Sequence, residues 1–149
     1  PERIEFCARG DADGALAAFR KALSLDPGFW EAAVNLADLH RARGEEAFAQ
    51  EVLRDALGRD PSSAALHHAL GLALVRQKRM PEAVASLSRA AALAPGDAHY
   101  AYVNAVALND SGRKSEALRA LDAGLARNPD DRQLLFTAAT FRVQAGDRA

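Results

Sequence analysis

The sequence lacks a surplus of positive charge, and this bears on its partners. Its 149 residues include 19 lysines and arginines against 20 acidic residues, which leaves a formal net charge of -1. A protein that binds a polyanion displaces phosphate counterions with a basic surface, so we expect no nucleic-acid partner. No stretch approaches the roughly 20 apolar residues of a membrane span, and the N-terminus does not resemble a signal peptide. We therefore expect no membrane contact.

Cysteine and β-branched residues are also scarce. The single cysteine, Cys7, cannot form an intrachain disulfide, so cysteine content leaves bacterial cytoplasm and periplasm both open. Isoleucine occurs once, whereas the helix formers alanine, leucine and arginine are abundant. These proportions predict an all-α fold, and the excess of arginine and alanine is typical of a GC-rich bacterial genome. The chain begins at Pro1 without a methionine, which indicates a piece of a longer protein.

What the sequence does contain is an internal repeat of 34 residues. Several columns share this step, and apolar residues recur between them at helical spacing. The columns are Pro27, Pro61, Pro95 and Pro129; Gly10, Gly44, Gly112 and Gly146, with Lys78 in the remaining place; Ala15, Ala49, Ala83 and Ala117; and Ala22, Ala56, Ala90 and Gly124. Each repeat therefore predicts a helix hairpin that buries its apolar face by stacking on its neighbours.

Each column has a physical role. The glycines are expected to end first helices with a positive φ, which would place Lys78 under modest strain. The prolines end second helices. The residues that follow two positions later are expected to cap the next first helices, and these are Ser63, Asp97 and Asp131. The small residues mark close approaches between helix backbones.

The order Leu70-Gly71, Ala83, Leu87, Ala90 and Pro95 resembles the tetratricopeptide repeat. The resemblance covers nearly the whole chain and implies a right-handed α-solenoid of stacked helix-turn-helix hairpins, a single domain over 1–149. We expect repeats at 30–63, 64–97 and 98–131, a partial repeat at 1–29 and a lone or capping helix at 131–146. Four residues depart from the family: Arg3 stands in a normally small position, Asn104 stands where leucine is preferred, and His67 and Ala33 stand where a large aromatic residue is preferred. We expect Asn104 to lie in the core and bond a neighbouring turn.

The usual residue patterns of catalytic and metal sites are missing. No serine lies in a G-x-S-x-G turn, and no glycine-rich phosphate loop follows a strand. The histidines are His40, His67, His68 and His99. None forms an H-x-x-x-H pair, and the two adjacent ones point about 100° apart on a helix, so we expect ordinary half-buried or groove histidines. The sequence predicts a protein without catalytic activity, metal or cofactor.

The family resemblance implies a binding surface. In such repeats the side chains at positions 2, 5, 9 and 12 of successive first helices line a concave groove. The expected groove residues are Val34, Asp38, Arg41, His68, Leu72, Val75, Tyr102, Val106, Asn109, Phe136 and Thr140. Positions 5 and 9 lack the lysine and asparagine with which some members grip a peptide carboxylate. An amphipathic helix or an extended apolar peptide suits this groove better, with Tyr102 and Phe136 as anchors.

The leading hypothesis is a non-catalytic protein–protein interaction scaffold, whose groove takes either a separate protein or the rest of its own chain. The alternative is an accessory or docking domain of a larger bacterial protein, such as an exported multihaem cytochrome or an enzyme. Its basis is the likeness of residues 72–77 and 100–103 to repeat domains of such proteins, although the sequence has no C-x-x-C-H haem motif. RNA binding by a related repeat family is disfavoured by the net charge of -1. Apolar edges on the first hairpin and last helix predict a homodimer, end-to-end or groove-mediated.

Overall fold

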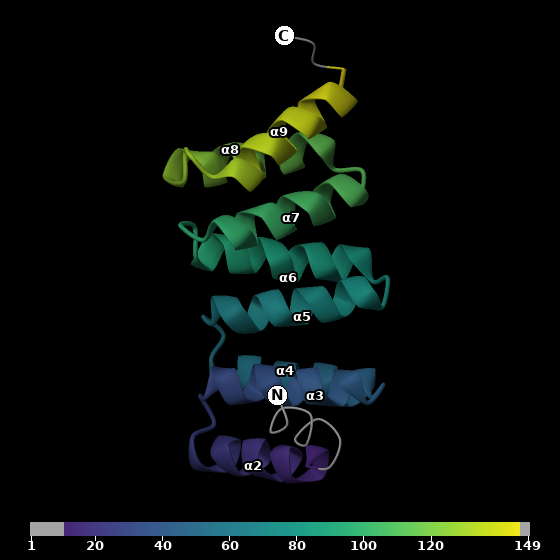
Figure 1. Cartoon of the computed structure of the whole chain (residues 1–149), viewed down its shortest axis with the longest axis vertical. Coiled ribbons are helices and arrows are strands. Elements are labelled where there is room, and N and C mark those ends of the chain that lie inside the picture. Colours follow the sequence, from purple (N-terminus) through teal and green to yellow (C-terminus); the bar gives the residue numbers. More distant parts are fainter. Residues whose placement is uncertain (1–10, 147–149) are drawn as a thin grey trace. The chain divides into compact units, whose positions relative to one another are not determined.

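The computed structural model describes residues 11–146, and within that range it contains helices and turns but no strand (Figure 1). The helices alternate between 14 and 13 residues in length. They are α2 (Ala12–Leu25), α3 (Trp30–Ala42), α4 (Glu46–Arg59), α5 (Ala64–Arg76), α6 (Met80–Leu93), α7 (Ala98–Asp110), α8 (Lys114–Arg127) and α9 (Arg132–Gln144). The predicted all-α fold is confirmed. Cys7, Arg3 and Gly10 lie outside the described residues.

The chain forms two compact units, residues 1–69 and residues 70–149, and the division falls within α5. In unit 1, α3 packs on both α2 and α4. In unit 2, α7 packs on α6 and α8, and α9 packs on α8 and also touches α7. Packing between sequence neighbours is what a stack of helix hairpins requires, because each hairpin covers its apolar face with the next one.

The turns follow the predicted glycine column. Gly44, Gly112 and Gly146 have φ angles of 78°, 79° and 78°, in the left-handed region that glycine enters at little cost. Lys78, in the equivalent turn, has a φ of 59° and is the one non-glycine residue with positive φ in the described range. The expected strain at Lys78 is therefore present.

Side-chain caps begin the first helices α5, α7 and α9, as their spacing from the prolines predicts. Asp97 Oδ1 accepts a hydrogen bond from the backbone N–H of Tyr100 at 3.0 Å, and Asp131 Oδ1 accepts one from Leu134 at 2.9 Å. Ser63 Oγ accepts one from the N–H of Leu66 at 3.3 Å. Each cap satisfies a backbone donor that has no partner inside its helix.

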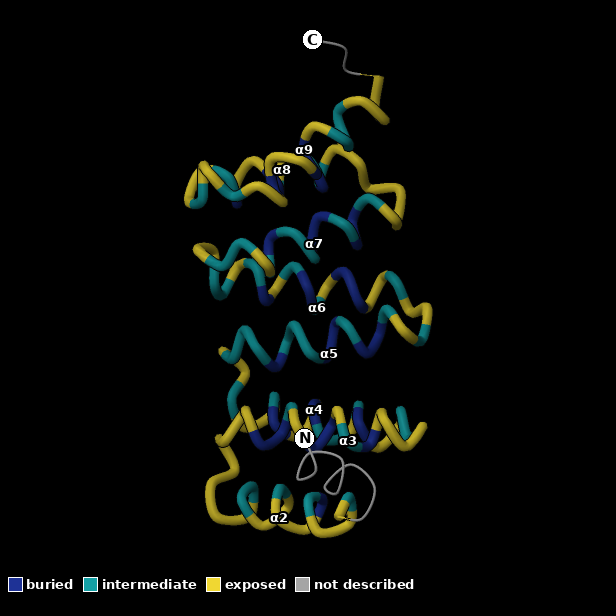
Figure 2. The backbone as a smooth tube through the Cα atoms, viewed as in Figure 1, coloured by how far each residue is buried: buried dark blue, intermediate teal, exposed yellow. Residues whose placement is uncertain are grey.

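In α4, α6 and α8 the small-residue columns are buried, and Figure 2 shows buried residues recurring along these helices. Within unit 2, a Cβ built on Gly124 would lie 2.8 Å from the Cβ of Ala101, and one built on Gly71 would lie 2.6 Å from the side chain of Leu87. Larger residues would push the helices apart. The core beside these contacts is formed by fully buried leucines such as Leu121 and Leu134.

The prediction for Asn104 is correct in its burial but wrong in its hydrogen-bond partner. Asn104 is buried, with 6% of its surface exposed, as expected. Its Oδ1 accepts a hydrogen bond from Ser88 Oγ at 2.9 Å, and Ser88 lies within α6 and not in a turn. The reason is that α6 packs along α7 at the level of Asn104, so a helix hydroxyl is the nearest polar partner.

Candidate functional site

The predicted groove residues of unit 1 form a polar surface on α3. Val34 is half-buried, whereas Asp38 and Arg41 are exposed. Arg41 and Asp38 are one helical turn apart and form an ion pair at 3.6 Å. An exposed pair of this kind contributes little stability. This part of the surface is therefore suited to polar contacts, and it offers no aromatic anchor among the predicted positions.

The predicted groove residues of α5 are all half-buried, and α5 is the helix that the two units share. His68 belongs to unit 1, whereas Leu72 and Val75 belong to unit 2. Val75 packs against the core cluster that includes Val84 and Leu108. Its apolar surface is therefore partly used by the core of unit 2.

In unit 2 the predicted groove positions form an apolar surface on two helices that touch each other, α7 and α9. Tyr102 and Val106 are half-buried on α7. On α9, Phe136 is 74% exposed and Val143 is 72% exposed. We call these four residues the apolar stripe. Among sixteen side chains at positions 2, 5, 9 and 12 of the four first helices, none is buried, because the buried columns face the second helices.

Polar side chains border the apolar stripe. Asn109 and Thr140, the remaining predicted groove residues of α7 and α9, are half-buried. The Thr140 hydroxyl donates to the backbone oxygen of Phe136 at 2.9 Å, which occupies it within its own helix. The ring of His99 lies 6.5 Å from that of Tyr102. These bordering side chains offer a few polar contacts to a bound chain, whereas the stripe between them is apolar.

The histidines do not gather into a site. His40 is buried, contrary to the expected half-buried or groove position, because its column faces the second helix, as Leu74 and Leu108 do. Its ring stacks on Phe48 with centroids 5.7 Å apart, and its Nδ1 lies 3.6 Å from Glu45 Oε2. His67 instead hydrogen-bonds the backbone oxygen of Pro61 at 2.8 Å.

Titratable side chains elsewhere in the described residues do not form a recognisable metal site. Within residues 11–146, no three His, Cys, Asp or Glu side chains are placed to hold a metal ion. Burial, and next the Asp97 carboxylate, raise the pKa of Tyr100. Over the same residues, no helix combines the length and the hydrophobicity that crossing a membrane requires.

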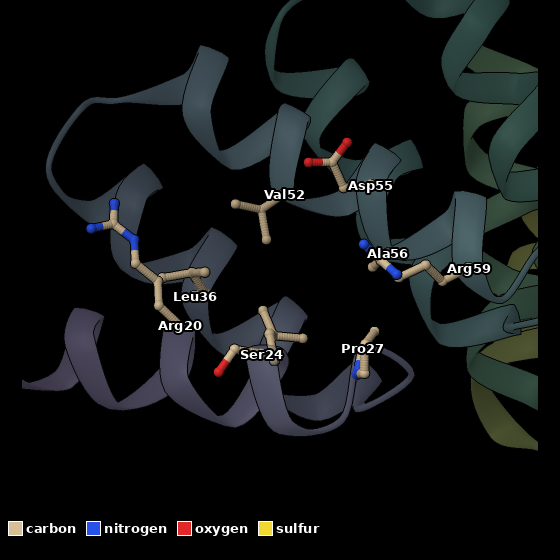
Figure 3. A pocket seen from close by; sticks show the side chains of 9 residues that line it. Arg20, Ser24, Pro27, Leu36, Val52, Asp55, Ala56 and Arg59 are labelled. Carbon is tan, nitrogen blue, oxygen red and sulfur yellow. The ribbon is translucent and has the colours of Figure 1, made fainter.

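Sequence reasoning missed a cavity of about 350 Å³ in unit 1 (Figure 3). It lies between α2 and α4, above Leu36 of α3, with Arg20, Asp55 and Arg59 on its rim. Leu36 points away from Val34 on α3, because two residues turn a helix by about 200°. The cavity is therefore separate from the predicted groove.

An equivalent cavity of about 410 Å³ lies in unit 2. Every residue that lines the first cavity has its counterpart 68 positions later, which is two repeat lengths, in the lining of the second. The counterparts of Arg20 and Asp55 are Ser88 and Ala123, so the second rim has less charge. Both cavities follow from the repeat itself, since each lies between two successive second helices.

Sequence reasoning also missed exposed apolar residues in unit 1. Leu25, Phe29, Trp30 and Phe48 are between 39% and 77% exposed. Phe29 provided a signal, because it stands in the capping column that Asp131 occupies later in the chain, and α3 has no side-chain cap. A capping position filled by an aromatic residue departs from the local rule.

Comparison with known proteins places this geometry in a family. The tetratricopeptide repeat family model matches residues 7–73, 41–107 and 74–138, which together cover most of the chain. No curated protein matches the sequence significantly.

Solved structures with the same arrangement of helices include MamA, at 25% sequence identity and a TM-score of 0.77, over 97% of this chain and 84% of that one. YrrB, described as a TPR protein with an unusual peptide-binding site, is 22% identical with a TM-score of 0.72, over 96% of this chain and 74% of that one. PilF of Pseudomonas aeruginosa is 24% identical with a TM-score of 0.75, over 97% of this chain and 66% of that one. The family match and the shared fold agree with the 34-residue period, and the chain belongs to the tetratricopeptide repeat family.

Proposed function

We propose that this protein is a non-catalytic scaffold and that the apolar stripe of unit 2 binds a peptide or helix of a partner protein. Proteins of this family are generally interaction scaffolds without catalytic activity. The finer proposal concerns where the partner lies: on Tyr102 and Val106 of α7 and on Phe136 and Val143 of α9.

The observation that supports the proposal most is the exposure of Phe136. Its side chain is 74% exposed although it lies in a well-formed helix whose buried face is occupied by Leu134 and Ala138. Large apolar side chains in register on two touching helices form a continuous surface, and such surfaces mark interaction sites. Tyr102 packs in part against the core cluster that includes Leu121 and Leu134, whereas Phe136 and Val143 are mostly exposed and lie outside that cluster.

The chemistry of the stripe indicates the class of partner. At positions 5 and 9 it has Tyr102 with Val106, and Phe136 with Thr140, so it offers no cation to a terminal carboxylate. An amphipathic helix or an extended apolar segment would instead cover the two aromatic rings, which are common anchors of interfaces. The segment would come from a separate protein or from the same polypeptide.

The experiment is a selection of binding peptides from a displayed random library, followed by titration of one synthetic peptide. We expect Tyr102→Ala and Phe136→Ala each to weaken binding by about 10-fold or more, as loss of an interface anchor does. Phe136→Ala should leave the thermal melt nearly unchanged, whereas Tyr102→Ala should lower it somewhat because the ring packs in part on the core cluster, so binding is measured well below the melt. Phe29→Ala is the matched control, because it removes an exposed aromatic ring from unit 1.

Full affinity in the Tyr102→Ala/Phe136→Ala double variant would show that the stripe is not the binding surface. An equal loss in Phe29→Ala would have the same meaning. The alternative of a docking domain in an exported multihaem cytochrome or enzyme stays a prediction, since no contact or side-chain cluster described above favours it.

A further inference from the structure

The cavity of unit 2 has a polar side chain where the cavity of unit 1 has a leucine. Asn104 borders the cavity of about 410 Å³ between α6 and α8, in the place that Leu36 takes beside the first cavity (Figure 3). Only 6% of the surface of Asn104 is exposed. A buried leucine would add to the core, whereas a buried amide costs free energy unless its polar atoms are hydrogen-bonded. Stability alone therefore does not favour Asn104, and departures of this kind are concentrated at functional sites.

The Asn104 side chain is paired through its oxygen but not through its nitrogen. Its Oδ1 accepts a hydrogen bond from the Ser88 hydroxyl at 2.9 Å. Its Nδ2 makes no hydrogen bond to any residue within 11–146. This nitrogen is not sealed in the core but retains access to solvent, and the open space that Asn104 borders is the cavity. The two N–H groups of the amide are therefore available to a ligand in that cavity.

The rim of the same cavity has a positive charge without a counter-charge. Arg127 lines the cavity at the C-terminal end of α8, and its side chain is exposed. It forms no ion pair with an acidic residue of the described range, whereas Arg79, Arg113 and Arg142 each form one. None of the residues that line this cavity is acidic, whereas the rim of the first cavity includes Asp55. The second cavity therefore favours a negatively charged group.

The cavity is held in shape beside Arg127 and is otherwise apolar. Asn128 Nδ2 donates to the backbone oxygens of Gly96 and Gly124 at 3.2 Å each, which ties the turn after α6 to the end of α8. Asp60, the counterpart of Asn128 in unit 1, has no side-chain N–H with which to do the same. Two alanines from α6 and two from α8 supply methyl groups to the walls. An apolar cavity of this size with a few polar groups is typical of a ligand site.

We propose that this cavity binds a carboxylate on an aliphatic stem, with Asn104 Nδ2 donating to one carboxylate oxygen and Arg127 to the other. The single charge of a carboxylate matches one guanidinium, and its two oxygens match two donor groups. The stem lies against the alanine methyl groups and belongs either to a free aliphatic acid or to an acidic side chain of a protein. The site is separate from the apolar stripe, because Asn104 is two residues from both Tyr102 and Val106, which turns a helix by about 200°.

Heteronuclear NMR of the whole chain tests the proposal during titration with hexanoate. The side-chain amide signals of Asn104 and the backbone amide signal of Gly124 should shift and reach saturation. Hexanamide, which has the same stem without the charge, should bind more weakly by about 10-fold or more. A second titration uses a short alanine peptide with blocked ends and one central glutamate. Tighter binding of hexanoate would identify a free acid as the ligand, and tighter binding of the peptide would identify a protein side chain.

Variants of the two donors complete the test. Asn104→Leu and Arg127→Gln should each weaken hexanoate binding by about 10-fold or more, because each loses a hydrogen bond to a charged group. Arg127 is exposed, so its variant also serves if Asn104→Leu melts early. Arg119→Gln is the matched control, because it removes an exposed cation from α8 outside the cavity, and it should bind like the wild type. The absence of saturable shifts with both probes, equal binding of hexanamide, or full affinity in either donor variant would overturn the proposal.

Discussion

Lys78 adopts a backbone conformation that glycine adopts in the equivalent turns. Its φ of 59° lies in the left-handed region, where a Cβ approaches the following carbonyl oxygen. No contact of the lysine side chain explains why it replaces glycine here. The turn nevertheless forms, because the flanking helices α5 and α6 hold it in place, so the residue is a local stability defect in a well-determined turn.

We expect Lys78→Gly to stabilise the protein by about 1 kcal/mol, since it removes the left-handed penalty of a residue with a side chain. Urea denaturation should show a higher midpoint with an unchanged slope. Gly112→Lys is the reverse control and should lower stability by a similar amount. An unchanged midpoint for Lys78→Gly would mean that the turn carries no strain.

A second residue-scale prediction concerns the buried pair Ser88 and Asn104. Ser88→Ala leaves the Asn104 amide buried without its hydroxyl donor, so we expect a loss of about 1–3 kcal/mol in unfolding free energy. The double variant Ser88→Ala/Asn104→Leu should recover most of this loss, because it removes both polar groups and the adjoining cavity has room for the leucine. The same urea titration measures both. If Ser88→Ala leaves the free energy of unfolding unchanged, another donor replaces the serine hydroxyl.

At the scale of elements, the helices are defined by their ends. Asp97 and Asp131 cap α7 and α9 through side-chain hydrogen bonds, whereas α3 begins at Phe29 without one. The C-terminal ends of α3, α7 and α9 are followed by glycines with positive φ. Because buried leucines and small residues recur at fixed positions of the repeat, the helix lengths set by these ends keep the packing faces in register from repeat to repeat.

We expect Asp131→Ala to destabilise α9 by about 1 kcal/mol, as loss of a capping side chain does. Amide hydrogen exchange should accelerate in the first turn of α9, where the N–H of Leu134 loses its acceptor. Asp130→Ala is the matched control, since Asp130 is exposed and makes no capping bond, and it should change stability by less than about 0.5 kcal/mol. Equal losses of stability in the two variants would mean that the loss comes from removing a negative charge near the helix start and not from removing the capping hydrogen bond.

At the scale of the whole molecule, stability is built from contacts between neighbouring helices within two units. In such repeats a perturbation spreads mainly to adjacent elements. Leu121 tests this, because it is fully buried in the cluster that joins α7, α8 and α9.

We expect Leu121→Ala to cost about 2–5 kcal/mol through lost burial and a residual cavity. Hydrogen exchange should accelerate most in α7, α8 and α9, and least in α2 and α3. Leu53→Ala, the equivalent change in unit 1, should reverse this pattern. Equal acceleration over all helices in both variants would contradict local stability and indicate one cooperative unit.

The sequence predicted the features of the repeat more completely than it predicted the contacts between helices and the surfaces around them. The fold class, capping residues and positive-φ turns were predictable, because each depends on the conformational preference of one residue and on a period of 34. The partner of Asn104, the burial of His40 and the cavity above Leu36 were not. Each of these depends on which side chain of another helix comes nearest.

The sequence by itself therefore determined that this protein is a stack of helix hairpins of the tetratricopeptide type, because periodicity and local preference suffice for that. The tertiary structure alone decided which residues remain exposed once the hairpins pack. Phe136 and Leu135 are neighbours of similar hydrophobicity in the sequence, and both face away from the core on α9. Leu134, beside them in the sequence, is fully buried, and this difference follows from where α7 and α8 lie against α9.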